Sequence, residues 1–138
     1  TFKNKLKVKT MQINPKIIVV DDKNTILMVQ EEFNRLFPYL KIEFLAVANT
    51  PPNHITNMFA NEIKGPLQGF RTADNKEQLV ITPDMSVAVL EEKFREIYRL
   101  KAQILRKSGK TWLETTVTDA WTLNEQNLQG EALSKHIN

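Results

Sequence analysis

Hydrophobic and polar positions repeat one pattern twice along the chain, in residues 18–45 and 79–105. Each segment begins with a short aliphatic run (IVV or LVI), passes through a polar turn and continues with apolar residues spaced by three, four, three and one. Such spacing predicts a helix with one apolar stripe. Each segment ends in a run of alternating apolar and polar residues, LKIEFL or LKAQIL, which predicts a half-buried strand. The two segments therefore indicate an internal strand–helix–strand repeat.

The expected start of each helix carries capping residues. Thr25 and Ser86 occupy matching positions directly before the apolar stripes, where a hydroxyl can accept a hydrogen bond from a free backbone amide. Asp21, Asp22 and Asp84 lie in the turns that precede them. Carboxylates at this position interact favourably with the helix dipole, so we expect them to cap the helices as well. Metal binding by the paired carboxylates is the alternative.

Two tandem βαβ units predict the α+β class. The expected architecture is ferredoxin-like, a split βαβ repeat with a mostly antiparallel sheet and both helices on one face. The alternative is another α+β sheet that uses the same elements in a different order. A length of 138 residues suits one core, so we expect a single domain over residues 1–138. The face of the sheet without helices is expected to be aliphatic and uncovered.

Two regions lie outside the repeat. Residues 46–76 form a long connection rich in proline and glycine, in which Ile55, Met58, Phe59 and Ile63 can form one short amphipathic helix. The chain closes with an expected terminal helix, for which Thr122 and Glu125 form a capping box. Long connections are often functional, so a pocket beneath residues 46–76 is a candidate ligand site.

Residues 106–116 read RKSGKTWLETT and contain the Gly-Lys-Thr letters of a phosphate-binding loop. Such a loop needs a further glycine at the position that Ile104 occupies here, and it opens a helix. The run TWLETTV instead predicts a strand. We therefore expect a hairpin with a strand at 102–106, a turn at 107–110 and an added strand at 111–117.

Composition excludes several classes of protein. The chain has no cysteine, which excludes disulfides, zinc–thiolate sites and thiol catalysis and suits a reducing cytoplasm. No apolar run is long enough to span a membrane. The composition therefore predicts a cytoplasmic protein without membrane contact.

The net charge of +3 comes from the first ten residues, TFKNKLKVKT, which hold four lysines. Without these four, 15 of the 19 basic residues remain against 16 acidic residues. The lysines alternate with Phe2, Asn4, Leu6 and Val8, which predicts an edge strand with lysines on its solvent face. An anion-binding arm is the alternative. The first residue is not methionine, so the chain either starts inside a longer one or begins naturally at Met11.

The candidate binding residues lie in the C-terminal third of the chain. Trp112 and Trp121 are the only tryptophans, and Arg106, Lys107 and Lys110 lie near the first of them. Aromatic rings among basic residues can stack on a base or hold an anion. The alternative is that Trp112 packs on the sheet and Trp121 anchors the last helix, since tryptophans are usually mostly buried. The sequence shows no catalytic or dinucleotide motif, so we predict no catalytic residue, metal or cofactor.

The runs ITPDMSVAVLEEKFREIY and RKSGKTWLETTVTDAWTLNEQN resemble a small family of uncharacterised bacterial proteins. The resemblance lies mainly in residues 79–127 and implies a discrete fold. It transfers no activity and no catalytic residue, because the family has none assigned.

These observations predict a non-enzymatic cytoplasmic module that binds another protein or a second copy of itself. The first alternative is nucleic-acid binding through the N-terminal lysine arm and the 106–110 turn. The aliphatic runs IIVV and LVI lack the stacking aromatics of an RNA-recognition sheet, which makes this alternative less favoured. The second alternative is a small-ligand sensor or enzyme with a pocket under residues 46–76.

Overall fold

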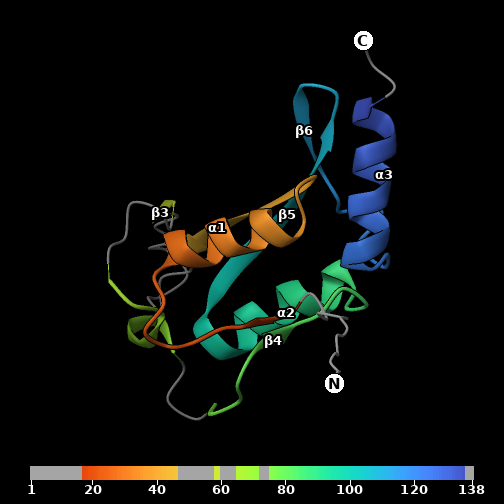
Figure 1. Ribbon diagram of the computed structural model, residues 1–138. Coiled ribbons are helices and arrows are strands. Elements are labelled where there is room, and N and C mark those ends of the chain that lie inside the picture. The colour runs from red at the N-terminus through yellow and green to blue at the C-terminus, as the bar shows by residue number, and fades with distance from the viewer. Residues whose placement is uncertain (1–16, 47–57, 60–64, 72–74, 136–138) are drawn as a thin grey trace, which may run out of the picture.

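The computed structural model describes residues 17–46, 58–59, 65–71 and 75–135. Helix α1 packs against β2, whereas α2 and α3 pack against the long strand β5 (Figure 1). The elements follow in the order β1 (Ile18–Val19), α1 (Ile26–Leu36), β2 (Leu40–Ala46), β3 (Met58–Phe59), the short 3-10 helix η3 (Leu67–Phe70), β4 (Val80–Ile81), α2 (Val87–Tyr98), β5 (Leu100–Ser108), β6 (Thr111–Glu114) and α3 (Leu123–Lys135).

The predicted α+β class is confirmed, and the described strand pairs are antiparallel. The strands form two sheets, β1–β4 and β3–β2–β5–β6, whereas a ferredoxin-like fold joins both βαβ units in one sheet. The ferredoxin-like strand order is therefore not observed. Its physical reason lies at the edge of β2 that faces away from β5, where α1 supplies hydrogen bonds at Leu40 and Ile42 and only the far end, Leu45 and Ala46, pairs with a strand. Gln30 Nε2 donates to the carbonyl of Ile42 at 3.1 Å, and Asn34 Nδ2 donates to the carbonyl of Leu40 at 2.8 Å.

The longest ladder joins the two predicted repeat segments. β2 and β5 pair from Leu40–Arg106 at one end to Ala46–Leu100 at the other. These two end pairs exchange places when LKIEFL is aligned with LKAQIL. The register is therefore symmetric about the middle of the ladder, and each segment supplies one strand of the centre of the molecule.

Helices α1 and α2 start where the sequence predicts. Thr25 and Ser86 each accept a hydrogen bond of 3.2 Å from the backbone amide three residues later. The expectation that the nearby carboxylates also cap is wrong. Asp21 and Asp84 accept hydrogen bonds within their own turns, and Asp22 bonds to distant side chains. The Thr25 and Ser86 hydroxyls accept from the amides of the first helical turn, and the carboxylates make other contacts.

The turn before each of these helices is also hydrogen-bonded to a segment further along the chain. The Leu67 amide donates to the carbonyl of Asn24 at 2.8 Å, and the Leu123 amide donates to the carbonyl of Met85 at 2.9 Å. Both leucine side chains are fully buried. In each strand–helix–strand segment, the turn before the helix is therefore hydrogen-bonded to a buried leucine that lies beyond the predicted end of the repeat.

The predicted C-terminal hairpin and terminal helix are confirmed. Gly109 turns the hairpin with a φ of 62°, in the left-handed region that glycine adopts without strain. The bounds differ from the prediction: β5 runs from Leu100 to Ser108, the turn is Gly109–Lys110 rather than 107–110, and the added strand ends at Glu114 rather than at residue 117. In the capping box of α3, Glu125 accepts from the Thr122 amide at 2.9 Å and the Thr122 hydroxyl accepts from the Glu125 amide at 3.0 Å.

The described ends of the long connection differ from the expectation. Met58 and Phe59 form strand β3, which pairs with the end of β2, so the short helix expected around them is wrong. The spacing of their apolar neighbours suits a helix, but the unpaired edge of β2 offers hydrogen bonds to a strand.

The core lies between the inner faces of the sheets and helices α1 and α2. Its largest fully buried side chains lie in or directly beside α1, β2, η3, β4, α2 and β5: Tyr98, Phe33, Phe37, Phe94, Leu40, Ile42, Leu67, Leu79, Ile81, Leu90, Ile97 and Leu100. Among the described helices, none has the length and apolar character needed to cross a membrane.

Candidate functional site

Strand β1 has one edge without a backbone partner among the described residues. The Val20 amide donates to the carbonyl of Leu79 at 2.9 Å, and Val19 lies opposite Val80. Only alternate residues exchange hydrogen bonds across an antiparallel pair, so the amide and carbonyl of Val19 point away from β4. An edge of this kind is a ready template for another extended segment.

A groove of mixed polar and apolar character lies between β1 and α1. Ile17, Val19 and Met28 line it and are 43%, 48% and 49% exposed, while Asn24 and Glu32 form part of its rim. Its volume is about 240 Å³. We call it the β1–α1 groove. It combines an open strand edge with exposed aliphatic side chains, which is the arrangement that binds extended polypeptides.

The expected bare aliphatic face belongs to this small sheet and not to the larger one. The outer face of the larger sheet carries mainly polar and charged residues, because the side chains of β2 and β5 alternate between its two faces. The residues of this outer face are Lys41, Glu43, Leu45, Lys101, Gln103, Leu105, Lys107, Trp112 and Glu114. The run IIVV accounts for the exposed aliphatic face of the small sheet, because Ile18 and Val20 are buried while Ile17 and Val19 are exposed.

The five predicted binding residues lie on two different faces of the hairpin. Lys107 and Trp112 are directly opposite each other on the outer face of the larger sheet, and Lys110 lies exposed in the turn. Lys41 Nζ lies 5.0 Å from the centre of the Trp112 ring. A half-buried tryptophan between two lysines is therefore presented on this face.

Arg106 and Trp121 lie on the opposite face, beside α3. The Arg106 guanidinium carbon lies 5.7 Å from the centre of the Trp121 ring, and Nη1 donates to Gln126 Oε1 at 2.9 Å. Nε of Arg106 is buried, and no side chain or backbone group of the described residues accepts a hydrogen bond from it. Trp121 is 38% exposed. The structure therefore does not bring all five residues into one surface.

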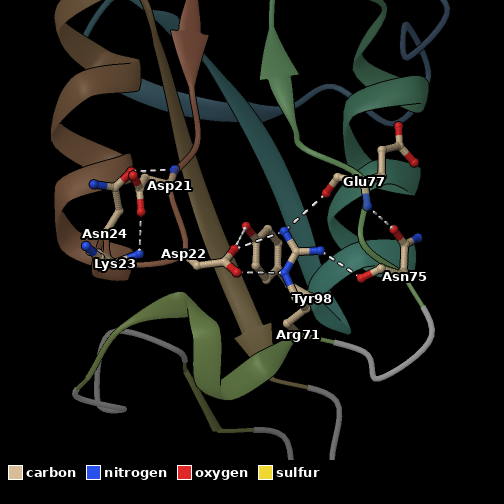
Figure 2. Close-up of polar contacts among 8 residues, drawn as sticks. All are labelled: Asp21, Asp22, Lys23, Asn24, Arg71, Asn75, Glu77 and Tyr98. Carbon is tan, nitrogen blue, oxygen red and sulfur yellow. Dashed lines mark hydrogen bonds and ion pairs between the residues drawn. The ribbon is translucent and has the colours of Figure 1, made fainter.

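A polar cluster at the other end of the molecule joins three segments (Figure 2). Arg71 contacts Asp22 through two hydrogen bonds, Nε to Oδ2 at 2.8 Å and Nη2 to Oδ1 at 3.0 Å. The Tyr98 hydroxyl donates to Asp22 Oδ1 at 2.7 Å. Arg71 also donates to the carbonyls of Asn75 and Glu77, and its guanidinium stacks on the Tyr98 ring at 5.2 Å.

The positive charge of Arg71 balances the negative charge of Asp22 within this cluster. The hydrogen bond from Arg71, followed by that from Tyr98, holds the pKa of Asp22 below its ordinary value. Burial, followed by the hydrogen bond to Asp22, raises the pKa of Tyr98 to about 12. A carboxylate already bound by a guanidinium and a buried phenol is poorly placed to take up a proton or a metal ion. We therefore assign the cluster a structural role.

A second groove, of about 340 Å³, lies between α2 and β5 and carries charged residues of both signs. Glu91, Glu92 and Asp119 line it together with Arg95 and Lys101. Burial raises the pKa of Glu91 above its ordinary value. No group of three or more histidine, cysteine or acidic side chains that could hold a metal ion occurs in the described part of the chain.

Comparisons with known proteins give no guide to the site. Neither a family model, nor a curated protein, nor a solved structure matches the chain. The resemblance to a bacterial family therefore stays a prediction. The N-terminal lysine arm lies outside the described residues, and so does most of the connection over the expected pocket.

The sequence analysis missed the residues of the β1–α1 groove. Ile17 and Val19 belong to the aliphatic run IIVV, which predicts a strand without marking a groove beside it, and Met28 falls outside the apolar stripe of α1. One available signal was the unbroken aliphatic run before Asp21, since a strand apolar on both faces must have both faces covered.

Proposed function

We propose that the protein is a non-enzymatic binding module that accepts an extended segment of another protein along β1, in the β1–α1 groove. The observation that carries the proposal is the open edge at Val19, flanked by exposed Ile17 and Met28. Added strands gain backbone hydrogen bonds at such an edge and gain specificity from the side-chain pockets beside it.

The size of the groove favours an extended segment over other ligands. At about 240 Å³ it falls below the range of about 300–1,000 Å³ that is usual for small-molecule pockets. Three half-exposed side chains also supply far less area than the roughly 1,200 Å² that a stable interface between two folded surfaces buries. A single strand needs only a narrow strip of surface.

The test uses a random peptide display library selected against the folded protein. Met28→Glu places a charge in the groove, so we expect the selected peptides to lose at least about tenfold in affinity. Val89→Glu is the matched control, because Val89 holds the corresponding position on α2 and is 46% exposed. Fluorescence anisotropy measures both. Equal affinity for wild type and Met28→Glu refutes the proposal.

A second candidate function rests on the outer face of the larger sheet. Trp112 lies there between Lys41 and Lys107, and a ring flanked by cations can stack on a nucleobase near a phosphate. Glu43 and Glu114 share this face and oppose a polyanion, so we rank the function second. It predicts single-stranded nucleic-acid binding that weakens steeply with salt and is lost in Trp112→Ala. Binding that does not weaken with added salt, or that Trp112→Ala retains, refutes this function.

A further inference from the structure

The groove between α2 and β5 lies where the second predicted repeat segment has smaller side chains than the first. The alignment of the two segments matches Leu27 of α1 with Ala88 of α2. It also matches Ile42 of β2 with Ala102 of β5. Both alanines line this groove, which we call the α2–β5 groove. Two small residues therefore leave room at a place where the first segment has two large ones.

The second segment also lacks a hydrogen bond that the first one makes. In the first segment, Gln30 Nε2 of α1 donates to the carbonyl of Ile42 at 3.1 Å. Glu91 holds the matching position on α2, and an ionised carboxylate accepts hydrogen bonds but cannot donate one. The matching carbonyl, that of Ala102, accordingly has no donor among the described residues.

The edge of β5 at Ala102 is open toward the groove. The Lys107 amide donates to the carbonyl of Tyr39 at 2.9 Å, so alternate residues counted from Lys107 bond to β2, and Ala102 is not one of them. On the other edge of β5, strand β6 pairs only with residues Leu105 to Ser108. The backbone amide and carbonyl of Ala102 therefore point away from β2, on the side where β5 has no strand partner at this position.

Two carboxylates of the α2–β5 groove have no cation bound to them. Glu91 and Asp119 line the groove, and neither takes part in an ion pair within the described part of the chain. The other charged groups of the groove are placed differently, because Arg95 contacts Glu92 and Lys101 is exposed to solvent. The groove therefore offers acceptors from two carboxylates and one backbone carbonyl.

The electrostatics of Glu91 agree with a missing positive charge. Burial raises the pKa of Glu91, and the nearby charge of Asp119 raises it further, while the Ile104 backbone and Lys101 offset only part of the rise. An additional cation beside the two carboxylates favours their ionised forms and compensates for the burial.

We propose that the α2–β5 groove binds an organic cation, a primary ammonium or a guanidinium group, between Glu91 and the Ala102 carbonyl, with Asp119 as a second anionic partner. These groups carry a positive charge and only hydrogen-bond donors, which complements a set of acceptors. The groove volume of about 340 Å³ falls in the range of about 300–1,000 Å³ that is usual for small-molecule pockets. The β1–α1 groove shares no lining residue with it, so the proposal does not depend on the proposed function.

The test titrates the folded full chain with N-butylguanidinium chloride and with n-butylammonium chloride and records amide NMR spectra. We expect saturable shifts of the Ala102 and Ile104 amide signals at millimolar probe concentrations, because the probes have few atoms with which to make contacts. N-Butylurea is the matched neutral probe, since it has a similar shape and N–H donors but no charge. It is expected to cause no saturable shift.

Glu91→Gln gives the second segment the residue that the first segment carries. The new amide can donate to the Ala102 carbonyl and has no charge, so the affinity for both cations is expected to fall at least about tenfold. Glu31→Gln is the matched control, because it removes the same charge from an exposed position on α1, and it is expected to keep the affinity within about twofold. An unshifted signal of the buried Leu90 amide shows that each variant remains folded.

Three results overturn the proposal: no saturable shift with either cation, equal shifts with the urea, or equal affinity of wild type and Glu91→Gln for the cations. A blocked Gly-Arg-Gly tripeptide then identifies the source of the cation. Tripeptide binding at least about tenfold tighter than that of N-butylguanidinium supports the site as one for an arginine side chain of a polypeptide. Equal or weaker binding supports it as a site for a free organic cation.

Discussion

Tyr98→Phe removes one hydroxyl from the polar cluster of Figure 2 and leaves the ring in place. The Tyr98 side chain is fully buried, and its hydroxyl donates to Asp22 Oδ1 at 2.7 Å. Packing is unchanged by this substitution, because phenylalanine fills the same space. The change in stability therefore reports the hydrogen bond and the ionisation of the phenol.

The expected loss at neutral pH is about 1–2 kcal/mol. A hydrogen bond to a charged group contributes roughly 1.5–3 kcal/mol. Asp22 keeps both contacts with Arg71 in the variant, and its side chain is 32% exposed, so water can replace the lost donor. These two facts place the loss at the lower end of the range.

The free energy of unfolding at alkaline pH gives a more specific test, because the pKa of Tyr98 is raised from 10.0 to about 12 in the folded protein. The stability linked to this shift is fully present below the unfolded pKa of about 10 and is lost as the pH rises toward the folded pKa. At about 1.36 kcal/mol per pKa unit, the loss approaches about 2.7 kcal/mol near pH 12. The phenylalanine variant has no phenol to ionise and escapes this loss.

Urea denaturation followed by circular dichroism, at a series of pH values from neutral to alkaline, measures both effects. The free energies of unfolding of wild type and variant are expected to differ by about 1–2 kcal/mol at neutral pH, to become equal between about pH 10 and pH 12, and to reverse in order near pH 12. A difference that stays constant across this range shows that Tyr98 ionises normally and refutes the reasoning.

Two further substitutions test other parts of the structure. Gly130→Ala is expected to lower the midpoint of thermal unfolding, although alanine favours a helix by about 1 kcal/mol, because the new Cβ would lie 2.8 Å from Tyr39 Cβ and 3.1 Å from its carbonyl oxygen. Gln129→Ala, at an exposed neighbouring position, is its control, and equal midpoints contradict the close approach. Relative to wild type, Glu91→Gln is expected to raise the free energy of unfolding more at pH 7 than at pH 4. Burial raises the pKa of Glu91 in the folded protein. The contribution of Glu91 to stability is therefore complete below the unfolded pKa and falls as the pH rises through the folded pKa. Denaturant midpoints of both chains at the two pH values measure this, and a pH-independent difference excludes the raised pKa.

Features with local causes could be predicted from the sequence. The caps at Thr25 and Ser86, the capping box of α3 and the turn at Gly109 each depend on residues within three or four positions. The helical stripes are also local signals, since their spacing records which face of the helix is buried.

Strand order depends on contacts that the pattern does not mark. At Leu40 and Ile42, the outer edge of β2 is closed by Gln30 and Asn34, two polar residues that look like ordinary solvent-facing positions of α1. The groove was hidden for a related reason. An aliphatic run such as IIVV predicts a strand, but it does not say whether one face or both are covered.

The polar cluster was out of reach because its members are far apart in the chain. Arg71 lies 49 residues from Asp22, and Tyr98 lies 76 residues from it. Each of the three fits a polar turn or an amphipathic helix equally well, so the sequence alone gives no reason to pair them.

The symmetric ladder between β2 and β5 has a consequence for how the chain reaches its native state. Each segment can form its helix and adjoining strand from nearby residues, but the centre of the sheet requires two strands about 60 residues apart in sequence to meet. Neither half contains a complete sheet, and each presents a long strand whose natural neighbour lies in the other. Cleavage between the halves should therefore give two fragments that are incomplete alone and complementary to each other, so that the fold returns when they are mixed.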